Sequence, residues 1–516
     1  MYLGTLTSLS SEWDIYWPVL CLLLAAGLCI TIDLTVRDKV GARLGVFFTA
    51  LAGIAAAAVM TVSEWQGISG SAEMLSGGAV LDGYGLFLTM TILAGTAICC
   101  FSAVDAVDKL HVTAGDFIGL VLVSASGMLL LVTANDLIML FLSIELMSLG
   151  IYVLAGTNRA SKLSVEASVK YLIMGAFASG FLLMGMALLY GATGSIELGA
   201  IGTQLMSADP LAGAALAPLG IALVLIGFCF KVGAFPFHQW VPDVYTGAPT
   251  AVTGFMAVAV KTAAFGALGR VALTVFPESS SIITQNAVTV LWVLAAATML
   301  LGNLIAVVQD NPKRMLAYSS VAHSGYLLMG VLVAMNGDSG GLAAMAFYLL
   351  VYTFGTGGAF ALLSFVSGEK EVNSKSDLRG LAKRKPLIAL LMAIFMLSLA
   401  GIPLTGGFLG KYYLFIEVIQ SEYYWLAIIA IISSVIGAFY YLGIIVQMFM
   451  EDEKGDEPVV SDESWGLLAA LSAAAVATLA LGILPGGLME DAREGAQNIT
   501  RTPAAAPAAL TQAAAK

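Results

Sequence analysis

The chain has 516 residues, of which 59% are hydrophobic and only 11% are charged, whereas about a quarter of the residues in a soluble domain are charged. This composition excludes an ordinary soluble domain and indicates that a lipid bilayer is the solvent. The formal net charge of -11 comes from loops and ends, and no basic stripe suggests nucleic acid as a partner.

Apolar runs between charged or Gly/Pro breaks predict an all-α polytopic membrane protein with about fourteen transmembrane helices, because one span needs roughly 20 apolar residues. In chain order, the predicted segments lie near residues 15–35, 44–63, 82–103, 114–133, 136–156, 170–191, 212–241, 248–270, 284–308, 315–335, 341–367, 386–420, 424–449 and 464–484.

The basic residues predict the orientation of these segments. Connections after odd-numbered segments carry most of the Lys and Arg residues, including a cluster in the 369–385 loop. Basic residues on the other side, tails included, are few: Arg270, Arg493, Arg501 and Lys516. Since cytoplasmic loops are rich in Lys and Arg, the odd connections are predicted to be cytoplasmic and both termini periplasmic.

Two segments are expected to be discontinuous helices. The twelfth, 386–420, is too long for a simple span and is interrupted by Gly401-Ile-Pro403. The seventh has a similar break around Pro236. Proline removes a backbone donor and clashes with the preceding turn, and the freed backbone groups are tolerated at membrane depth only beside protein or water.

These breaks suggest an internal repeat, because each broken segment is the fourth in a unit of five. Five is odd, so two such units enter the membrane from opposite faces, as in transporters whose ion sites lie at broken helices. The predicted organisation is 1–113 (helices 1–3), 114–270 (first repeat, helices 4–8), 284–449 (second inverted repeat, helices 9–13), 450–487 (helix 14) and 488–516, a flexible Ala/Pro-rich tail.

Ionisable residues inside the apolar segments are the candidate functional residues. Along the chain they are Glu145, Lys231, Lys261, His323 and Lys411. A charge in hydrocarbon costs at least a few kcal/mol, so such residues normally face protein or water, find partners and mark proton relays. Glu145 and Lys231 are predicted to pair, so that the charge of the lysine can follow small changes in their separation.

Structural alternatives remain for each candidate. Glu145, Lys261 and Lys411 could form helix–helix ion pairs, and Lys231 could extend to the interface if its helix ended at the following proline. His323, and His238 in the seventh segment, are second-rank candidates that could simply hydrogen-bond between helices. Charged residues near segment ends are expected to mark the interface: Asp136, Glu166, Lys170 and Glu417.

The chain is not expected to bind a cofactor or metal itself. Its five cysteines lie in apolar runs and lack the C-x-x-C pairs or spacing of metal and Fe–S ligands. No flavin or nucleotide fingerprint is present either.

Three runs together resemble the antiporter-like subunits of respiratory complex I, NADH-quinone oxidoreductase. They are Phe230-Lys-Val-Gly-Ala-Phe-Pro-Phe-His-Gln-Trp-Val-Pro-Asp-Val-Tyr-Thr-Gly-Ala-Pro-Thr250, Asn311-Pro-Lys-Arg-Met-Leu-Ala-Tyr-Ser-Ser-Val-Ala-His-Ser-Gly-Tyr326 and Gly401-Ile-Pro-Leu-Thr-Gly-Gly-Phe-Leu-Gly-Lys411. The resemblance covers roughly residues 80 to 450. The M-type branch usually has Glu where Lys411 stands and the L-type is longer, so the N-type branch (subunit N) fits best.

The resemblance implies fourteen helices, inverted repeats and proton translocation coupled to NADH oxidation and quinone reduction in partner subunits. NADH, FMN, Fe–S clusters and quinone would then lie in those partners. A neighbouring antiporter-like subunit and small membrane subunits would contact this chain in a bacterial inner (plasma) membrane. Residue by residue, Glu145, Lys231, Lys261 and Lys411 match the family's key membrane residues.

The mechanism expected from this resemblance begins with proton uptake from the cytoplasm near segments 7 and 8. The proton is held around Lys231 and Lys261, passes His323 to Lys411 and leaves on the other side. The nearest alternative is a subunit of a multisubunit Na+/H+ antiporter or a membrane-bound hydrogenase. A standalone solute transporter and a structural scaffold are further alternatives.

Overall fold

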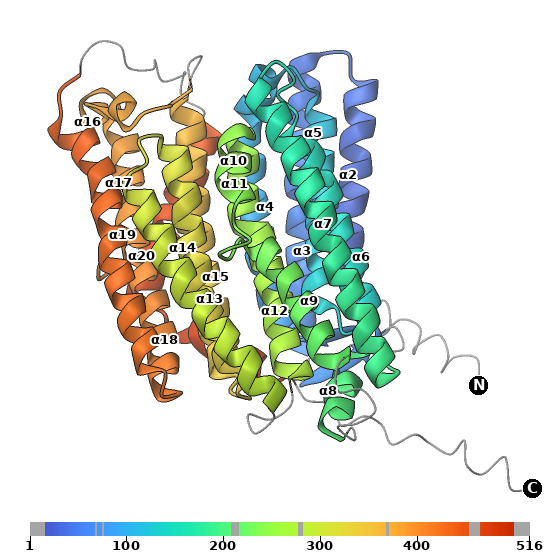
Figure 1. Ribbon diagram of the computed structural model, residues 1–516. Coiled ribbons are helices and arrows are strands. Elements are labelled where there is room, and N and C mark those ends of the chain that lie inside the picture. Colours follow the sequence, from blue (N-terminus) through green and yellow to red (C-terminus); the bar gives the residue numbers. More distant parts are fainter. Residues whose placement is uncertain are drawn as a thin grey trace, which may run out of the picture.

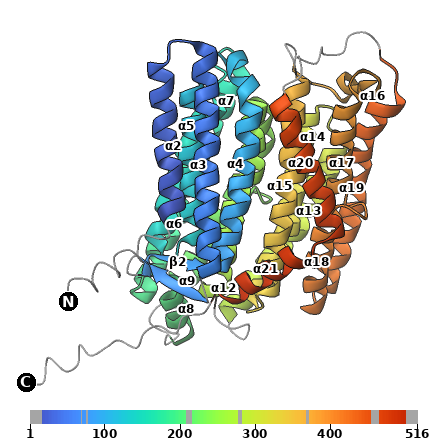
Figure 2. The same ribbon diagram turned by 180° about the vertical axis from the view of Figure 1, so that it is seen from behind.

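Helices run side by side between the two ends of the protein (Figures 1 and 2). The computed structural model describes residues 16–67, 70–74, 77–207, 216–276, 282–367, 371–453 and 465–499. Within these ranges, twelve helices are long and apolar enough to cross a membrane, and two shorter apolar helices, Leu216–Val232 and Pro386–Ala400, begin the two segments predicted to be broken. The prediction of an all-α polytopic membrane protein is confirmed.

The long helices follow the predicted segments closely. In chain order they are α2 (Trp17–Thr35), α3 (Lys39–Gly67), α4 (Gly83–Leu110), α5 (Ala114–Thr133), α6 (Leu137–Ala155), α7 (Lys162–Thr193), α9 (Leu216–Val232), α11 (Thr250–Phe255) continued by a π-helical turn η3 (Met256–Val260) and α12 (Lys261–Val275), α13 (Ile282–Val307), α14 (Pro312–Met335), α15 (Gly340–Val366), α17 (Pro386–Ala400), α18 (Gly406–Gln420), α19 (Tyr424–Met450) and α20 (Trp465–Ile483).

Shorter elements lie mostly at the ends of the bundle, and the segment predictions did not include them. They are an antiparallel hairpin of β1 (Ser71–Met74) and β2 (Ala79–Asp82), α8 (Leu198–Ser207), α10 (Trp240–Gly247), the 3-10 turn η4 (Lys375–Leu378), α16 (Leu381–Arg384) and α21 (Gly486–Gln497). The tail was predicted to be flexible from about Leu488. That prediction was wrong up to Gln497, because α21 buries Met489, Ala492 and Ala496 against the bundle. Residues from 500 onward lie outside the described part.

Local sequence explains where the helices begin. Asp136 accepts a hydrogen bond from the backbone N–H of Met139 at 2.6 Å and caps α6, and Asn311 caps α14 in the same way through Arg314 at 3.0 Å. Such side chains satisfy backbone donors that the first helical turn leaves unpaired. Asp136, expected at the membrane interface, therefore also has a structural task at a helix start.

Both predicted breaks are present and have the same construction. Helix α9 is followed by Gly233 with φ +70° and α17 by Gly401 with φ +82°. In each case the backbone N–H after this glycine donates to the carbonyl five residues earlier. Ala234 donates to Cys229 at 2.8 Å, and Ile402 donates to Leu397 at 3.0 Å. This is a Schellman cap, which needs a left-handed residue that glycine adopts without strain. The two breaks therefore share one local construction, and the repeat relation between the two units stays a prediction.

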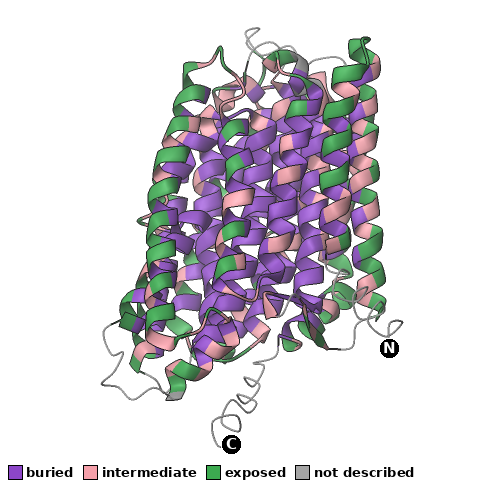
Figure 3. Ribbon diagram, turned by 90° about the vertical axis from the view of Figure 1, so that its right-hand side faces the viewer, coloured by how far each residue is buried: buried purple, intermediate pink, exposed green. Residues whose placement is uncertain are grey.

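The central helices of the bundle are enclosed by protein. In the most apolar 18 residues of each helix, every residue of the Thr250–Val275 helix and 94% of those of Pro312–Met335 are buried. The corresponding share is 33% in the outer helices α2 and α19. Figure 3 shows this contrast between a buried middle and exposed outer helices. Exposed apolar side chains on the outer helices, such as Phe439 on α19, suit contact with lipid.

Candidate functional site

Lys411 lies on α18 directly beside the break that follows α17. Its side chain is buried, and Nζ donates hydrogen bonds to the Leu399 carbonyl at 2.9 Å, the Ala400 carbonyl at 3.2 Å and the Ser434 hydroxyl at 2.9 Å. The two carbonyls belong to the last turn of α17, where helical partners are missing. The broken helix thus supplies the acceptors that a buried ammonium group needs.

Lys231 is buried in the last turn of α9, so the alternative that it reaches the membrane interface does not hold. Its Nζ donates to the Ser148 hydroxyl at 2.9 Å and to the Tyr152 hydroxyl at 3.4 Å, both on α6. Glu145, one turn earlier on α6, instead accepts a hydrogen bond from Ser179 at 2.5 Å. In the described part of the chain, Glu145 and Lys231 are therefore near each other but not in a direct ion pair.

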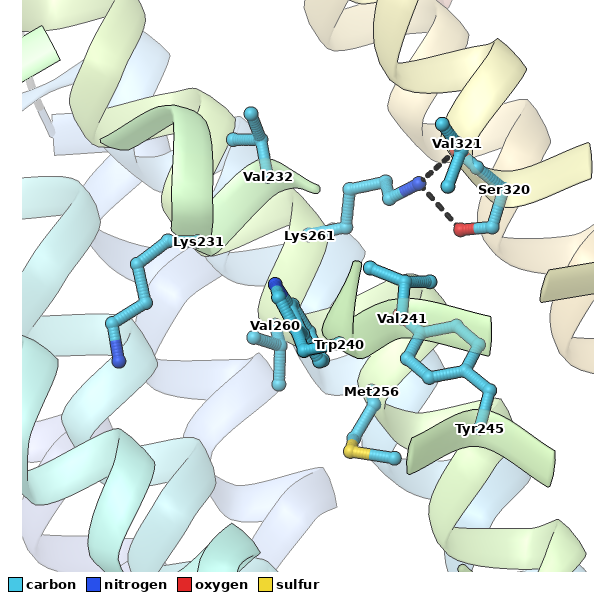
Figure 4. A pocket seen from close by; sticks show the side chains of 10 residues that line it. All are labelled: Lys231, Val232, Trp240, Val241, Tyr245, Met256, Val260, Lys261, Ser320 and Val321. Carbon is cyan, nitrogen blue, oxygen red and sulfur yellow. Dashed lines mark hydrogen bonds between the residues drawn. The ribbon is translucent and has the colours of Figure 1, made fainter. Parts of the chain in front are cut away.

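Lys261 begins α12, directly after the π-helical turn. Its Nζ donates to both the carbonyl and the hydroxyl of Ser320 on α14, each at 2.5 Å, and lies 5.3 Å from the centre of the Tyr352 ring. Figure 4 shows that Lys261 and Lys231 line one small pocket but point away from each other, with Trp240 and Val260 between them. The interval between the two lysines is apolar.

His323 lies on α14 among tyrosines. Its Nδ1 is hydrogen-bonded to the Tyr348 hydroxyl, and its Nε2 is 2.9 Å from the Tyr441 hydroxyl. The His323 ring centre is 5.0 Å from that of Tyr352 and 5.6 Å from that of Tyr326. His323 therefore sits between the tyrosine beside Lys261 and the tyrosine beside Lys411.

The contacts form a continuous series across the bundle. The Lys261 amine packs on Tyr352, Tyr352 on His323, and His323 on Tyr326, whose ring centre is 5.3 Å from the Lys411 amine. These tyrosines were not predicted as part of the site. Their position in the middle of apolar segments, away from the interface where Tyr is usual, was the available signal.

His238 is placed apart from the other candidates. It lies half-buried in the break between α9 and α10, its ring packs on Phe235 with centres 5.5 Å apart, and its Nδ1 has no hydrogen-bond partner among the described residues. No hydrogen bond joins it to a lysine in that part of the chain. Its role remains a prediction.

Arg270 was predicted to lie in a connection, and that placement is wrong. Helix α12 continues to Val275, and Arg270 lies buried within it. The Arg270 guanidinium forms a bidentate ion pair with the buried Asp82 carboxylate, with N–O distances of 2.6 and 3.0 Å. A third bond reaches the Val132 carbonyl at 3.0 Å. A buried arginine is tolerated when its charge is paired, and here the partner Asp82 is the last residue of β2. The Arg270 Nε has no hydrogen-bond partner among the described residues.

An ion cluster lies at the end of the bundle that carries α10. Asp243 on α10 contacts Lys170 on α7 at 2.9 Å and Arg314 on α14 at 3.0 Å, and Lys170 also contacts Glu166 at 2.7 Å. All four side chains are partly exposed, as expected for residues near segment ends. The cluster joins helices of both predicted repeats through α10, which follows the break of segment 7.

The described residues contain no group of three or more His, Cys, Asp or Glu side chains that could hold a metal ion. Four of the five cysteines are buried and one is half-buried, and all five are free thiols. What the residues of the site share is a capacity to accept and donate protons. Their chemistry is thus that of acids, bases and hydroxyls in an apolar enclosure.

The sequence of the chain is similar to those of known membrane subunits. The family described as NADH:quinone oxidoreductase/Mrp antiporter, transmembrane, matches residues 134–437. NADH-quinone oxidoreductase subunit N 1 of Herpetosiphon aurantiacus is 41% identical over 481 residues, which are 92% of this chain and 95% of that protein. Subunit N of Trichlorobacter lovleyi is 39% identical over 455 residues, 87% of this chain and 90% of that protein.

Solved structures show the same likeness. A chain of respiratory complex I from Thermus thermophilus with bound aureothin has a TM-score of 0.77 and 34% identity, covering 93% of this chain and all of that chain. A chain of the Mrp complex from Dietzia sp. DQ12-45-1b has a TM-score of 0.80 and 26% identity, covering 95% and 97%.

Proposed function

Since the chain belongs to the antiporter-like membrane subunits of NADH-quinone oxidoreductase, subunit N type, we propose that five of its buried residues carry protons across the bilayer. We call Glu145, Lys231, Lys261, His323 and Lys411 the relay row. The chain is a multi-pass inner-membrane subunit of a proton-translocating enzyme, and it works beside other membrane subunits. The observation that carries the proposal is the series of contacts that links Lys261 to Lys411 through the enclosed centre of the bundle.

The first part of the path runs from the ion cluster of α10 to Lys231 and Lys261. A proton is taken up at the cytoplasmic end and held on the amine of Lys231, next to the carboxylate of Glu145. Transfer to the amine of Lys261 requires water between the two lysines, because their side chains point apart across an apolar interval. This interval therefore acts as the barrier that prevents free proton flow.

The second part of the path uses hydroxyl groups. The Lys261 ammonium gives its proton toward Ser320 and His323, and the imidazole passes a proton on to the neutral amine of Lys411. A hydroxyl can accept from an ammonium group and can donate to a neutral amine, so reorientation of Ser320, Ser148 or Ser434 accommodates both protonation states. A carboxylate in direct contact would hold the charged form instead.

The redox chemistry belongs to partner subunits. We assign NADH, FMN, Fe–S clusters and quinone to those partners, because the sequence lacks a flavin or nucleotide fingerprint and the ligand spacing of an Fe–S cluster. We also propose that both termini lie on the periplasmic side, because most Lys and Arg residues fall in the odd-numbered connections. His238 is kept as a secondary relay candidate at the break of segment 7.

Replacement of Lys261 tests the proposal. Lys261→Ala removes the amine between the two halves of the path, so quinone-dependent proton pumping by the assembled complex should fall at least about tenfold, the scale of losing a proton-transfer group. Lys383→Ala is the matched control, because Lys383 is 69% exposed and its surface ion pair with Asp452 should contribute little. Normal pumping by the Lys261 variant, normalised to assembled complex, would refute the relay.

A second candidate function is that of a Na+/H+ antiporter subunit, favoured by the likeness to the Mrp complex. Purification in mild detergent separates the two. Co-purifying flavin and Fe–S subunits, with pumping that depends on NADH oxidation, support the redox enzyme. Sodium-dependent proton exchange without such partners would support the antiporter.

A further inference from the structure

Glu417 is a second charged side chain on α18, the helix that carries Lys411. It lies six residues after Lys411, which corresponds to about 9 Å along the helix axis, in the last turn before α18 ends at Gln420. This turn faces the end of the bundle opposite α16 (Figure 1). Glu417 was expected only to mark the membrane interface, yet the residue is 7% exposed.

The Glu417 carboxylate points at the beginning of α15. A Cβ atom at Gly340 would lie 2.5 Å from Glu417 Oε2 and 3.1 Å from the Asp338 carboxylate, so both carboxylates lie against this first turn. Two carboxylates therefore converge on one helix N-terminus, where the backbone N–H groups and the helix dipole favour negative charge. Asp338 is exposed and already bonds the Gly340 N–H at 2.8 Å, whereas Glu417 is enclosed.

The only cation that contacts Glu417 in the described part of the chain comes from α21. Arg493 Nη2 lies 3.9 Å from Glu417 Oε1, too far for a hydrogen bond, and the Arg493 side chain is 52% exposed. Helix α21 lies across this end of the bundle (Figure 2). Its position is fixed by backbone contact, since a Cβ at Gly83 would lie 2.8 Å from the Gly495 Cα.

We propose that Glu417 is the release-side proton acceptor of the path and that α21 presents Arg493 to it. The Lys411 ammonium loses a proton, which crosses the intervening distance through water and binds the Glu417 carboxylate. The carboxylic acid then gives that proton to water at the surface beside Arg493. The negative charge of Asp338 disfavours a charge on Glu417, and the positive charge of Arg493 favours it. The Glu417 carboxylate is therefore not held in a permanent ion pair. This inference rests on the proposed role of Lys411.

The test compares variants of the intact complex in inverted inner-membrane vesicles. Glu417→Gln should lower the protons pumped per quinone reduced severalfold, with normal amounts of assembled complex. Glu417→Asp keeps an acid and should restore much of the pumping. The matched control is Glu494→Gln on α21, which removes the same charge from an exposed position and should pump normally.

A parallel Lys411→Ala variant separates the two proposals. If that variant stops pumping while Glu417→Gln pumps normally, the release role is wrong and the relay row stands. If both variants pump normally, the relay row itself fails. Should Glu417→Gln not assemble, the wild-type complex is treated with a hydrophobic carbodiimide, which modifies protonated carboxyl groups in apolar sites. Modification of Glu417 found by mass spectrometry supports the proposal, and an unmodified Glu417 overturns it.

Discussion

The side-chain amine of each lysine in the relay row donates hydrogen bonds to neutral oxygen atoms. Lys231 bonds hydroxyls, Lys261 a hydroxyl and a carbonyl, and Lys411 two carbonyls and a hydroxyl. A buried ammonium tied to a carboxylate would be a structural ion pair, costly to break because each charge would be left without compensation. Neutral acceptors allow the proton to leave without stranding a negative partner, which is the property that a relay requires.

Among the described residues, Glu145 makes no direct ion pair with Lys231 and bonds Ser179 instead, so under the proposal it acts on the lysine only through its charge. Glu145→Gln removes the charge that favours a proton on Lys231, so we expect pumping to fall severalfold while the amount of assembled complex stays near normal. Proton uptake normalised to assembled complex measures this. The control is Glu166→Gln, whose side chain is 54% exposed in a surface pair. Loss of assembly before loss of pumping would mean that Glu145 is a structural residue.

At the residue scale, the burial of the three lysines was predictable from the sequence, and their surroundings were not. A lysine deep in an apolar run is conspicuous, so Lys231, Lys261 and Lys411 stand out in the sequence. The hydroxyl partners depend on how α6, α14, α15 and α19 pack, which spacing along one helix does not reveal. Arg270 was misplaced for the same reason, since its partner Asp82 is 188 positions away in the chain.

At the scale of elements, the broken helices decide where the charges can lie. The sequence predicted both breaks because Gly and Pro interrupt long apolar runs. It did not predict that the cap glycine and the lysine touch. A Cβ at Gly401 would lie 3.2 Å from Lys411 Cδ and 3.3 Å from its Nζ, so the cap shapes the space that holds the amine.

Gly401→Ala tests this coupling between cap and amine. Alanine at φ +82° should cost roughly 1–2 kcal/mol of stability, and its methyl group should displace the Lys411 side chain and lower pumping per assembled complex. Gly443→Ala inside α19 is the matched control, because a Cβ atom added at this position would have nothing within 4 Å. Thermal stability of the complex and proton pumping are measured together. A variant that is destabilised but pumps normally would show that the cap does not position the amine.

At the scale of the whole molecule, each apolar helix that could span a membrane in the described ranges falls on a segment that hydropathy predicted, because lipid demands long apolar helices with internal hydrogen bonds. The elements that hydropathy missed lie mostly at the ends of the bundle. There, water and protein both supply hydrogen-bond partners for the backbone, so long apolar helices are not required. Helix α21 is the clearest case. Its composition resembles a flexible tail, yet close approach of Gly495 to Gly83 fixes it to the bundle.

Orientation in the membrane sets the direction of the path and can be tested directly. The start of α2 and the whole of α21 lie at the end of the bundle opposite α16 (Figures 1 and 2). The 371–385 connection, at the α16 end, is rich in Lys and Arg. Loops rich in these residues are retained on the cytoplasmic side of the membrane. In inverted inner-membrane vesicles, a protease site inserted between α15 and η4 should be cleaved, whereas one at the C-terminus should be protected until detergent is added. Cleavage of both sites would place them on one face and would contradict the odd number of spans, three, that is predicted between the loop and the C-terminus. Protection of the loop with cleavage of the C-terminus would reverse the orientation, so that the ion cluster around Asp243 would become the release side and Glu417 the uptake side.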